Sequence, residues 1–327
     1  MDIGAIERYE TTKLADSLMI KDIDWQSYLT DKQTGNIEYP SVYGDAAYDI
    51  LENTDAHVGG KLPWSKTHDR IVFRPNELTI WSGSNGTGKS LLTAQAILGF
   101  VSKQGSHALI WSPEMTAPAQ VARLVRQGTG IALPTRQYFN SVLEYLDGKL
   151  YLYVREHGVT CDEVVGLIRF AAAELGNDQT LHIVIDSLMK VSGINPDDYG
   201  TQKEFLNRLT NEARDLYTPQ GAGVHIHLVA HARKPLNDNT FSDKASVKGA
   251  SEITDQADNV LVANRNRRKQ KEVEQGDSEH EDEPDCYLSV VKQRHGTGWE
   301  GTIGLWFHDK SMAFISSPDG RYQSLIV

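Results

Sequence analysis

The sequence predicts an α/β fold in which helices cover both faces of a mostly parallel β-sheet, with an antiparallel extension near the C-terminus. The first observation is a glycine-rich loop at residues 83–90, which lies between an apolar, β-branched run and a segment of helical periodicity. The second is the alternation of such runs and segments from Arg74 onward. The third is a change after residue 258, where strand-like runs follow one another.

Each predicted element has a local reason in the sequence. Short runs rich in aliphatic and aromatic residues are typical of buried strands, and here they occupy residues 77–82, 108–112, 150–154, 181–186 and 224–231. Apolar residues at helical spacing predict helices over residues 91–101, 116–128, 135–146, 161–175 and 202–217. Thr116 and Thr135 stand where helix N-caps are expected. The strands of the C-terminal extension are predicted at residues 259–263, 286–293, 302–307 and 312–316.

Composition limits the class of protein. The chain has 327 residues, of which 39% are hydrophobic, which allows two domains or one large α/β domain with extensions. No apolar run is long enough to span a membrane and the first residues lack a signal-peptide pattern, so we expect a cytoplasmic protein. Cys161 and Cys286 are the only cysteines, and they fit neither a zinc-binding spacing nor a disulfide framework.

The charge balance bears on nucleic-acid binding. The net charge is −11, from 33 basic and 44 acidic residues, which excludes a uniformly basic nucleic-acid binder. A local basic channel is still compatible with this total, because binding follows local charge. Residues 264–285 form a charge-dense insert, basic in its first half and acidic in its second, and we expect it to be the mobile tip of a surface hairpin.

The glycine-rich loop fits the pattern G-x-x-x-x-G-K-[ST] of a phosphate-binding loop. Glycines allow a tight turn whose backbone N–H groups face a polyphosphate, and the following helix N-terminus adds partial positive charge. Lys89 can reach the β- and γ-phosphates of ATP or another nucleoside triphosphate, and the Ser90 hydroxyl can bind Mg²⁺. The simpler alternative is a glycine-rich turn that matches by chance. The predicted nucleotide-binding residues are Gly83, Ser84, Asn85, Gly86, Thr87, Gly88, Lys89 and Ser90.

Polar residues follow three of the predicted parallel strands, at the sheet edge where ligands bind in such folds. Asp186 ends a buried strand and can hold Mg²⁺; the alternative is a cap of the next turn. Glu114 can polarise an attacking water or simply favour the start of a helix. His231 can contact the γ-phosphate, or be a satisfied histidine on an alternating strand face with His225 and His227.

Two basic residues, Lys292 and Arg294, lie at the end of a late strand. An arginine placed on a neighbouring subunit's γ-phosphate would stabilise the charge of the transition state. The alternative is a pair of solvated charges at a strand end.

The N-terminal residues 1–60 are predicted to be an extension ahead of the main domain, residues 61–327. Its one helical segment covers residues 42–51, with apolar residues on one face. Two interpretations stay open: a helix packed on its own domain, or an arm that docks on a neighbouring subunit.

Taken together, several segments resemble the ATPase domain of the ring-shaped, DnaB-like replicative DNA helicases and their T-odd phage relatives. The resemblance covers about residues 62–318, and its segments occur in the family's order. Besides the glycine loop they are residues 111–115, 183–186, 231–235, 247–251, 257–260 and 291–296.

This resemblance implies a RecA-like P-loop NTPase core, a hexameric ring and ATP sites between subunits. By matching position, Glu114 is similar to the catalytic carboxylate, His231 to the γ-phosphate sensor, and Arg294 with Lys292 to the finger supplied in trans. A histidine at 231 resembles the phage and mitochondrial branch. The implied location is the cytoplasm of a phage host.

The segment of residues 234–251 resembles the central-channel loop that grips single-stranded DNA, which requires backbone contacts without sequence preference. The residues expected to contact DNA are Lys244, Lys248, Asn237 and Asn239. A primase-like segment is not seen ahead of the motor, so a primase, polymerase or loader is expected as a separate partner. The predicted function is an ATP-dependent replicative helicase without primase activity. The alternative is a RecA-like recombinase or DNA-binding filament ATPase.

Overall fold

The computed structural model describes residues 39–52, 59–154, 158–195, 198–231, 254–276, 279–296 and 298–326. The chain divides into two compact units, residues 1–56 and 57–327. In the first unit, η1 (Pro40–Tyr43) leads into α3 (Gly44–Glu52), close to the predicted helix. Pro40 at the first helical position sets the helical φ angle in advance. Val42, Tyr48 and Leu51 on this segment are largely exposed.

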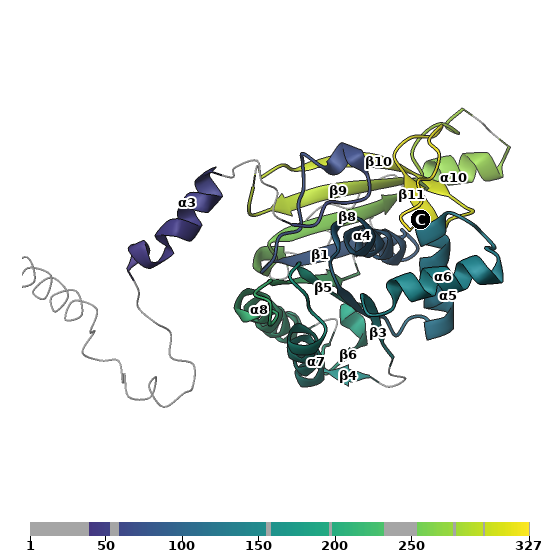
Figure 1. The fold of residues 1–327 in the computed structure, drawn as a ribbon. Coiled ribbons are helices and arrows are strands. Elements are labelled where there is room, and N and C mark those ends of the chain that lie inside the picture. The colour runs from purple at the N-terminus through teal and green to yellow at the C-terminus, as the bar shows by residue number, and fades with distance from the viewer. Residues whose placement is uncertain are drawn as a thin grey trace, which may run out of the picture. The chain divides into compact units, whose positions relative to one another are not determined.

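The second unit is built on a sheet of nine described strands, in the spatial order β11-β10-β9-β8-β1-β7-β5-β2-β3 (Figure 1). In chain order they are β1 (Leu78–Gly83), β2 (Ala108–Trp111), β3 (Leu150–Tyr153), β5 (Leu181–Asp186), β7 (Val224–Val229), β8 (Asn259–Arg265), β9 (Cys286–Gln293), β10 (Gly301–His308) and β11 (Ala313–Ile315). A small second sheet pairs β4 (Val159–Thr160) with β6 (Val191–Ser192).

The neighbouring strands β3, β2, β5, β7, β1 and β8 are parallel to one another. Strands β9, β10 and β11 add an antiparallel extension beside β8. The central strand β1 pairs with β7 on one side and β8 on the other, so Ile80 lies between Leu228 and Val260. The mostly parallel sheet with its C-terminal antiparallel extension is therefore confirmed.

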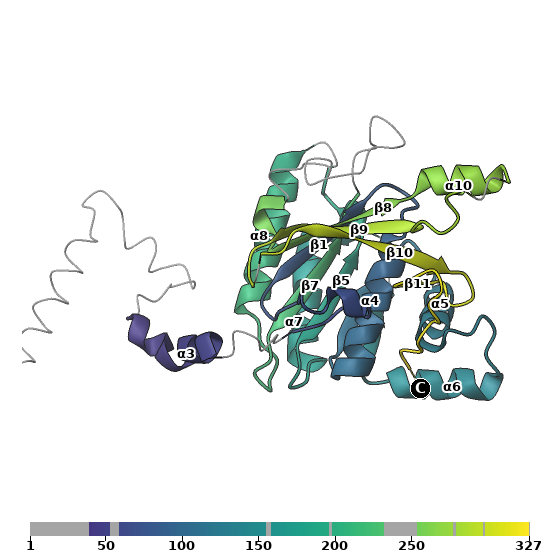
Figure 2. The same cartoon turned by 90° about the horizontal axis from the view of Figure 1, so that it is seen from above.

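Helices cover both faces of the sheet (Figure 2). One face carries α4 (Lys89–Gln104), α5 (Ala117–Thr129) and α6 (Arg136–Leu146), and the other carries α7 (Cys161–Glu174) and α8 (Tyr199–Asp215). A hydrophobic core lies on each face of the sheet, and alternate β1 side chains point into the two cores. Trp81 packs with α4, and Ile80 packs with α8. Fully burying each such side chain is worth about 1.5–3 kcal/mol.

Local signals fix several helix starts. Thr135 accepts a hydrogen bond from the backbone of Tyr138, and Thr160 forms a capping box with Glu163. Thr116 occupies the predicted N-cap position of α5, although its side chain makes no capping bond. Short helical turns η2 (Ser65–Thr67) and η3 (Leu188–Lys190) complete the connections described.

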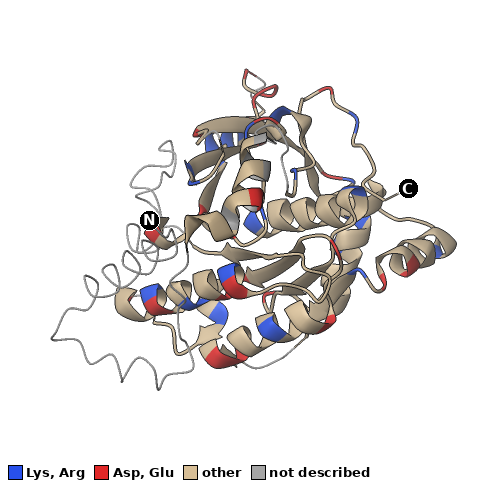
Figure 3. Cartoon of the chain, turned by 60° about the vertical axis from the view of Figure 1, so that its left-hand side comes forward, with Lys and Arg blue, Asp and Glu red and all other residues tan. Residues whose placement is uncertain are grey.

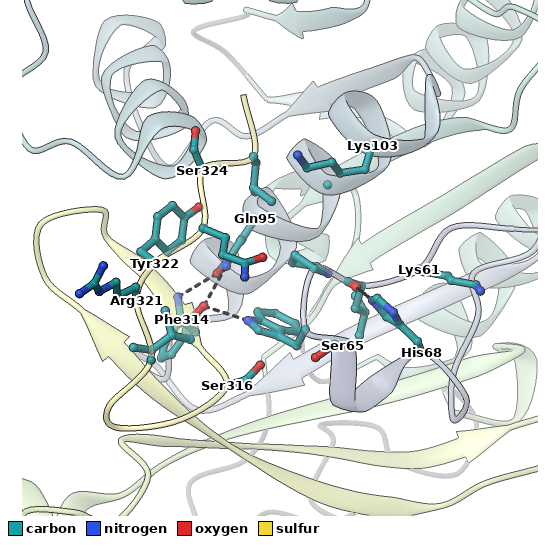
Figure 4. A pocket seen from close by; sticks show the side chains of 18 of the residues that line it. Lys61, Ser65, His68, Gln95, Lys103, Phe314, Ser316, Arg321, Tyr322 and Ser324 are labelled. Atoms are coloured by element: carbon teal, nitrogen blue, oxygen red, sulfur yellow. Dashed lines mark hydrogen bonds between the residues drawn. The ribbon is translucent and has the colours of Figure 1, made fainter. Parts of the chain in front are cut away.

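The strand β11 is fastened to α4 (Figure 4). The Gln95 amide donates to the carbonyl of Phe314 at 2.9 Å and accepts from its N–H at 2.8 Å. Trp64 Nε1 donates to the same carbonyl at 2.9 Å. A cavity of about 760 Å³ lies beside this junction, and none of the predicted site residues lines it. The junction fixes Phe314 next to the start of α4.

Candidate nucleotide-binding site

The topology brings the predicted site residues to one edge of the sheet. β1, β7, β5 and β2 are neighbouring parallel strands, so their carboxyl ends lie together. A cleft of about 960 Å³ opens at this edge. The predicted residues that line it are Asn85, Gly86, Gly88, Lys89, Ser90, Glu114, Asp186 and His231.

The loop between β1 and α4 has backbone geometry that requires glycine. Gly83 has φ 150°, and a Cβ there would lie 2.5 Å from the Ala263 carbonyl oxygen. Gly86 and Gly88 have φ values of 76° and 89°. The Thr87 hydroxyl donates to the Ser84 carbonyl at 2.9 Å, which closes the turn. This agreement between sequence and backbone argues against a chance match of the motif.

Lys89 is the first residue of α4 and is almost fully buried. Its Nζ donates to the carbonyls of Gly83 at 2.8 Å and Ser84 at 2.9 Å, so the ammonium group rests on the loop. Burial lowers the pKa of Lys89, while the charges of Asp186 and Glu114 act in the opposite direction. The site thus holds a desolvated cation opposite two carboxylates.

Asp186 ends β5 and is 4% exposed. It accepts hydrogen bonds from Ser90 and, at 3.4 Å through Oδ2, from Ser112, but its buried Oδ1 has no hydrogen-bond partner. Burial raises the pKa of Asp186, and the hydrogen bond from Ser90 opposes this. A buried carboxylate oxygen without a partner beside a serine hydroxyl fits a cation ligand.

Ser90 and Asp186 suit Mg²⁺ better than they suit a metal ion whose ligands all come from the protein. Mg²⁺ is usually bound through one or two carboxylates together with substrate phosphates. Among the described residues no group of three or more His, Cys, Asp and Glu side chains could hold a metal. Ser90 and Asp186 would therefore supply the protein ligands, and nucleotide phosphates the others.

Glu114 and His231 lie next to each other in the cleft. Glu114 Oε1 accepts from the Ser187 hydroxyl at 3.1 Å and lies 3.7 Å from His231 Nε2. Burial lowers the pKa of His231, Lys89 lowers it further, and Glu114 partly offsets both effects. The ring is thus neutral at pH 7, and its other nitrogen, Nδ1, is buried without a partner.

Sequence reasoning missed residues that the fold brings to the same cleft. Ser112 and Ser187 bond the two carboxylates. Ser112 is the last residue of one predicted strand and Ser187 directly follows another, so their positions at strand ends could have marked them. Arg123 reaches the cleft from α5 with a buried Nε that has no partner, and no pattern in the sequence marks it. Met115, Met189 and Lys190 complete this side of the lining.

Lys292 and Arg294 lie at the opposite edge of the sheet, because β9 runs antiparallel to β8 and ends where β8 begins. Lys292 Nζ donates to the carbonyls of Thr254 at 2.8 Å and Asp255 at 3.0 Å. Arg294 bonds the buried carboxylate of Asp258 at 2.9 Å. Both charges are thus bonded to neighbouring groups, although Arg294 remains partly exposed, and neither residue lines its own chain's cleft.

The predicted DNA contacts, Asn237, Asn239, Lys244 and Lys248, lie outside the described residues. The charged insert is partly described and contains α10 (Arg267–Glu274), which the sequence analysis did not predict. Elsewhere basic and acidic residues are interspersed along the described helices (Figure 3).

Comparison with known proteins places this site in a family. A family model described as an AAA domain matches residues 68–236, just over half of the chain. The chain belongs to this AAA-domain family. The matched span of the AAA domain includes the glycine loop, Glu114, Asp186 and His231.

Solved structures share the fold of this AAA domain. The ATPase domain of G40P is 13% identical with a TM-score of 0.70, and the match covers 86% of this chain and 99% of that one. A structure of a DnaB-like replicative helicase and its interactions with primase is 14% identical with a TM-score of 0.65, covering 88% and 68%. The predicted resemblance to DnaB-like ATPase domains is confirmed for the RecA-like fold, and the phage and mitochondrial branch stays a prediction.

A search of the curated proteins found no match to the sequence. Within the part of the chain that the structure describes, no helix combines the length and the apolar character that crossing a bilayer requires.

Proposed function

We propose that the chain is the ATP-driven motor of a replicative DNA helicase, which moves along single-stranded DNA and separates the duplex without primase activity. The observation that carries the proposal is the cleft itself. A phosphate-binding loop, a buried carboxylate with an unpartnered oxygen and a second carboxylate beside a neutral histidine meet at one sheet edge. The DnaB-like fold supports a motor that works on DNA.

In this proposal each side chain has a distinct task. Mg²⁺–ATP, when bound, supplies the transferable phosphoryl group and a cation that neutralises its charge. Lys89 stabilises phosphate charge, and Ser90 and Asp186 hold the Mg²⁺. Glu114 orients and polarises the attacking water, and Ser187 fixes the carboxylate that does so. His231, next to Glu114, couples loss of the γ-phosphate to the segment that follows it.

The position of the proposed finger residues supports a site shared between subunits. Arg294, with Lys292, stands at the edge opposite its own cleft, so it can act on phosphate only in a neighbouring copy. A hexameric ring provides such a neighbour, with α3 and the rest of residues 1–60 as the arm that docks on it. The exposed apolar residues of this segment are compatible with docking.

The experiment that tests the proposal is ATP hydrolysis with and without single-stranded DNA, with Lys89→Ala as the blank. Strong stimulation by single strands, followed by unwinding of a forked duplex, is the expected result. Lys244→Ala with Lys248→Ala should remove the stimulation and leave basal turnover, since these residues are proposed to contact DNA alone. A rate of ATP hydrolysis that does not change when DNA is added would contradict the proposal of a DNA motor. Strong DNA binding in open filaments, without unwinding, would favour the recombinase alternative.

A further inference from the structure

The cavity beside the junction of β11 and α4 has no task in the proposed function. Its volume is about 760 Å³, and it shares no lining residue with the nucleotide-binding cleft. Three segments that are distant in the sequence form its walls: residues 59–68, residues 95–104 of α4 and residues 314–325. Its volume lies in the range of cavities that bind ligands.

The cavity is basic, although the chain as a whole has a net charge of −11. Its described lining includes three lysine and arginine side chains and one histidine, but no aspartate or glutamate. Lys61 and Arg321 stand on opposite sides of it (Figure 4). Neither side chain forms an ion pair or a hydrogen bond with a residue that the structure describes. These two cations are therefore available to a ligand at two separate points.

The aromatic part of the lining is apolar in character, because its polar atoms bond within the protein. Trp64 Nε1 donates to the Phe314 carbonyl at 2.9 Å, and the Tyr322 hydroxyl donates to the Gln127 carbonyl. Pro63 is partly exposed and adds an aliphatic ring to the lining. A large apolar side chain placed here would be removed from water without taking a hydrogen-bond partner from these groups.

An acidic peptide suits these walls better than a nucleic acid does. Bases bind to proteins by stacking on open aromatic faces. Trp64 and Phe314 are only 2% and 5% exposed, and Tyr322 already stacks on His308, so these rings leave little open face for a base. A single small anion would pair with only one of the two separated cations. A peptide can place an acidic residue at each side of the cavity and an apolar side chain between them.

We propose that this cavity is a docking site for a partner protein that carries an acidic segment with one large apolar side chain. The apolar side chain lies in the cavity beside Pro63 and supplies the affinity. The acidic residues on either side of it pair with Lys61 and Arg321, which gives specificity and speeds association. Since the cavity and the nucleotide-binding cleft have separate linings, the chain can bind partner and nucleotide together. Docking of this kind is independent of the proposed motor activity.

The test is fluorescence anisotropy of the full chain with a labelled synthetic peptide in which aspartates flank a central Leu-Phe pair. We expect saturable binding that weakens as salt is added, and that weakens about tenfold in Lys61→Glu and in Arg321→Glu. Arg321→Lys, which keeps the charge, should bind the peptide as the wild type does. Lys203→Glu, at an exposed position of α8, is the matched control. Thermal unfolding checks that each variant is folded.

Two altered peptides separate charge from apolar contact. Replacing the aspartates by asparagines, or the Leu-Phe pair by two serines, should each weaken binding about tenfold or more. ADP with Mg²⁺ should leave the affinity of the first peptide unchanged.

Each of the other outcomes overturns the proposal. If the wild type does not bind the peptide, the cavity is not a site for an acidic segment. If both charge reversals leave the affinity unchanged, the peptide binds elsewhere. If either altered peptide binds as tightly as the first, charge or the apolar side chain plays no part. Displacement by ADP would show that cavity and cleft are not separate sites. If the reversals weaken binding of labelled oligothymidylate and not of the peptide, the cavity binds nucleic acid instead.

Discussion

At the scale of single residues, the main feature of the site is that its charged side chains are removed from water. Lys89 and Asp186 are both nearly buried, so burial disfavours the charge on each, and the attraction between them offsets part of this cost. The arrangement leaves a carboxylate oxygen and an ammonium group directed at a cleft where phosphates and a cation would complete the balance of charge.

Lys89→Ala tests this balance. Hydrolysis of ATP should fall by about 10²-fold or more, because a charged donor to the transferring phosphate is lost. Lys103→Ala, near the exposed end of the same helix, is the matched control and should hydrolyse ATP at the wild-type rate. Steady-state turnover measures both variants, and normal turnover by Lys89→Ala would refute the site.

Glu114→Gln tests the other carboxylate. We expect turnover to fall by about 10²–10⁴-fold while ATP still binds, because the amide keeps the shape of the side chain but cannot act as a base. Equilibrium binding and single-turnover hydrolysis separate the two effects. Glu174→Gln, at an exposed end of α7, controls for the chemical change. Loss of binding in parallel with turnover would show that Glu114 has a structural role instead.

At the scale of elements, strands β5 and β7 carry a buried chain of neutral histidines, which bond to side chains of β1. Trp81 Nε1 donates to Nδ1 of His227 at 3.2 Å, so Nε2 of His227 carries the proton and donates to His182 at 3.0 Å. His225 donates to the Arg74 carbonyl and accepts from the Thr79 hydroxyl. The period-2 face predicted for β7 is therefore a set of satisfied core histidines.

The buried histidines predict that the folded state loses stability in acid. Burial lowers the pKa of His225 to about 4 and holds the pKa values of His182 and His227 well below 6.5. The unfolded chain then binds more protons than the folded one, so stability is complete above pH 6.5 and falls as the pH drops toward 4. Glu77, whose pKa burial raises to about 7, opposes this by one proton at most.

Urea unfolding between pH 7 and 4.5 measures the effect. His225→Gln should reduce the slope of unfolding free energy against pH by up to about 1.4 kcal/mol per pH unit, because one titrating group is removed. An unaltered slope in His225→Gln would mean that this histidine does not resist protonation.

The strand-end pair of Arg294 and Asp258 has a structural role besides any catalytic one. Asp258 is 2% exposed, and it also accepts from the Leu78 backbone at the start of β1. Arg294→Ala should lower the free energy of unfolding by about 1–3 kcal/mol, because a buried carboxylate loses a charged donor. Adding Asp258→Asn should restore part of this stability but none of the ATPase activity. Recovery of both would assign Arg294 to the fold alone.

At the scale of the whole molecule, the cleft and the finger residues occupy opposite edges of one sheet. Under the proposed function, a single subunit would therefore hold halves of two different sites. Mixing Arg294→Ala with Glu114→Gln should partly restore hydrolysis, because one interface in the mixed assembly joins the intact halves. Turnover across a range of ratios measures the rescue, with each variant alone as control. Additive activities at every ratio would contradict a shared site.

The sequence by itself determined the strands, the main helices and the glycine loop, since these depend on local periodicity and on backbone conformations that few residues adopt. It also placed Glu114, Asp186 and His231 at strand ends, which parallel pairing then brought together. The roles assigned to them stay predictions. Only the tertiary structure decided which residues from distant segments meet: Ser112 with Asp186, Arg294 with Asp258, and Gln95 with Phe314. Such contacts depend on strand register and packing between segments far apart in the chain, and no local pattern specifies them.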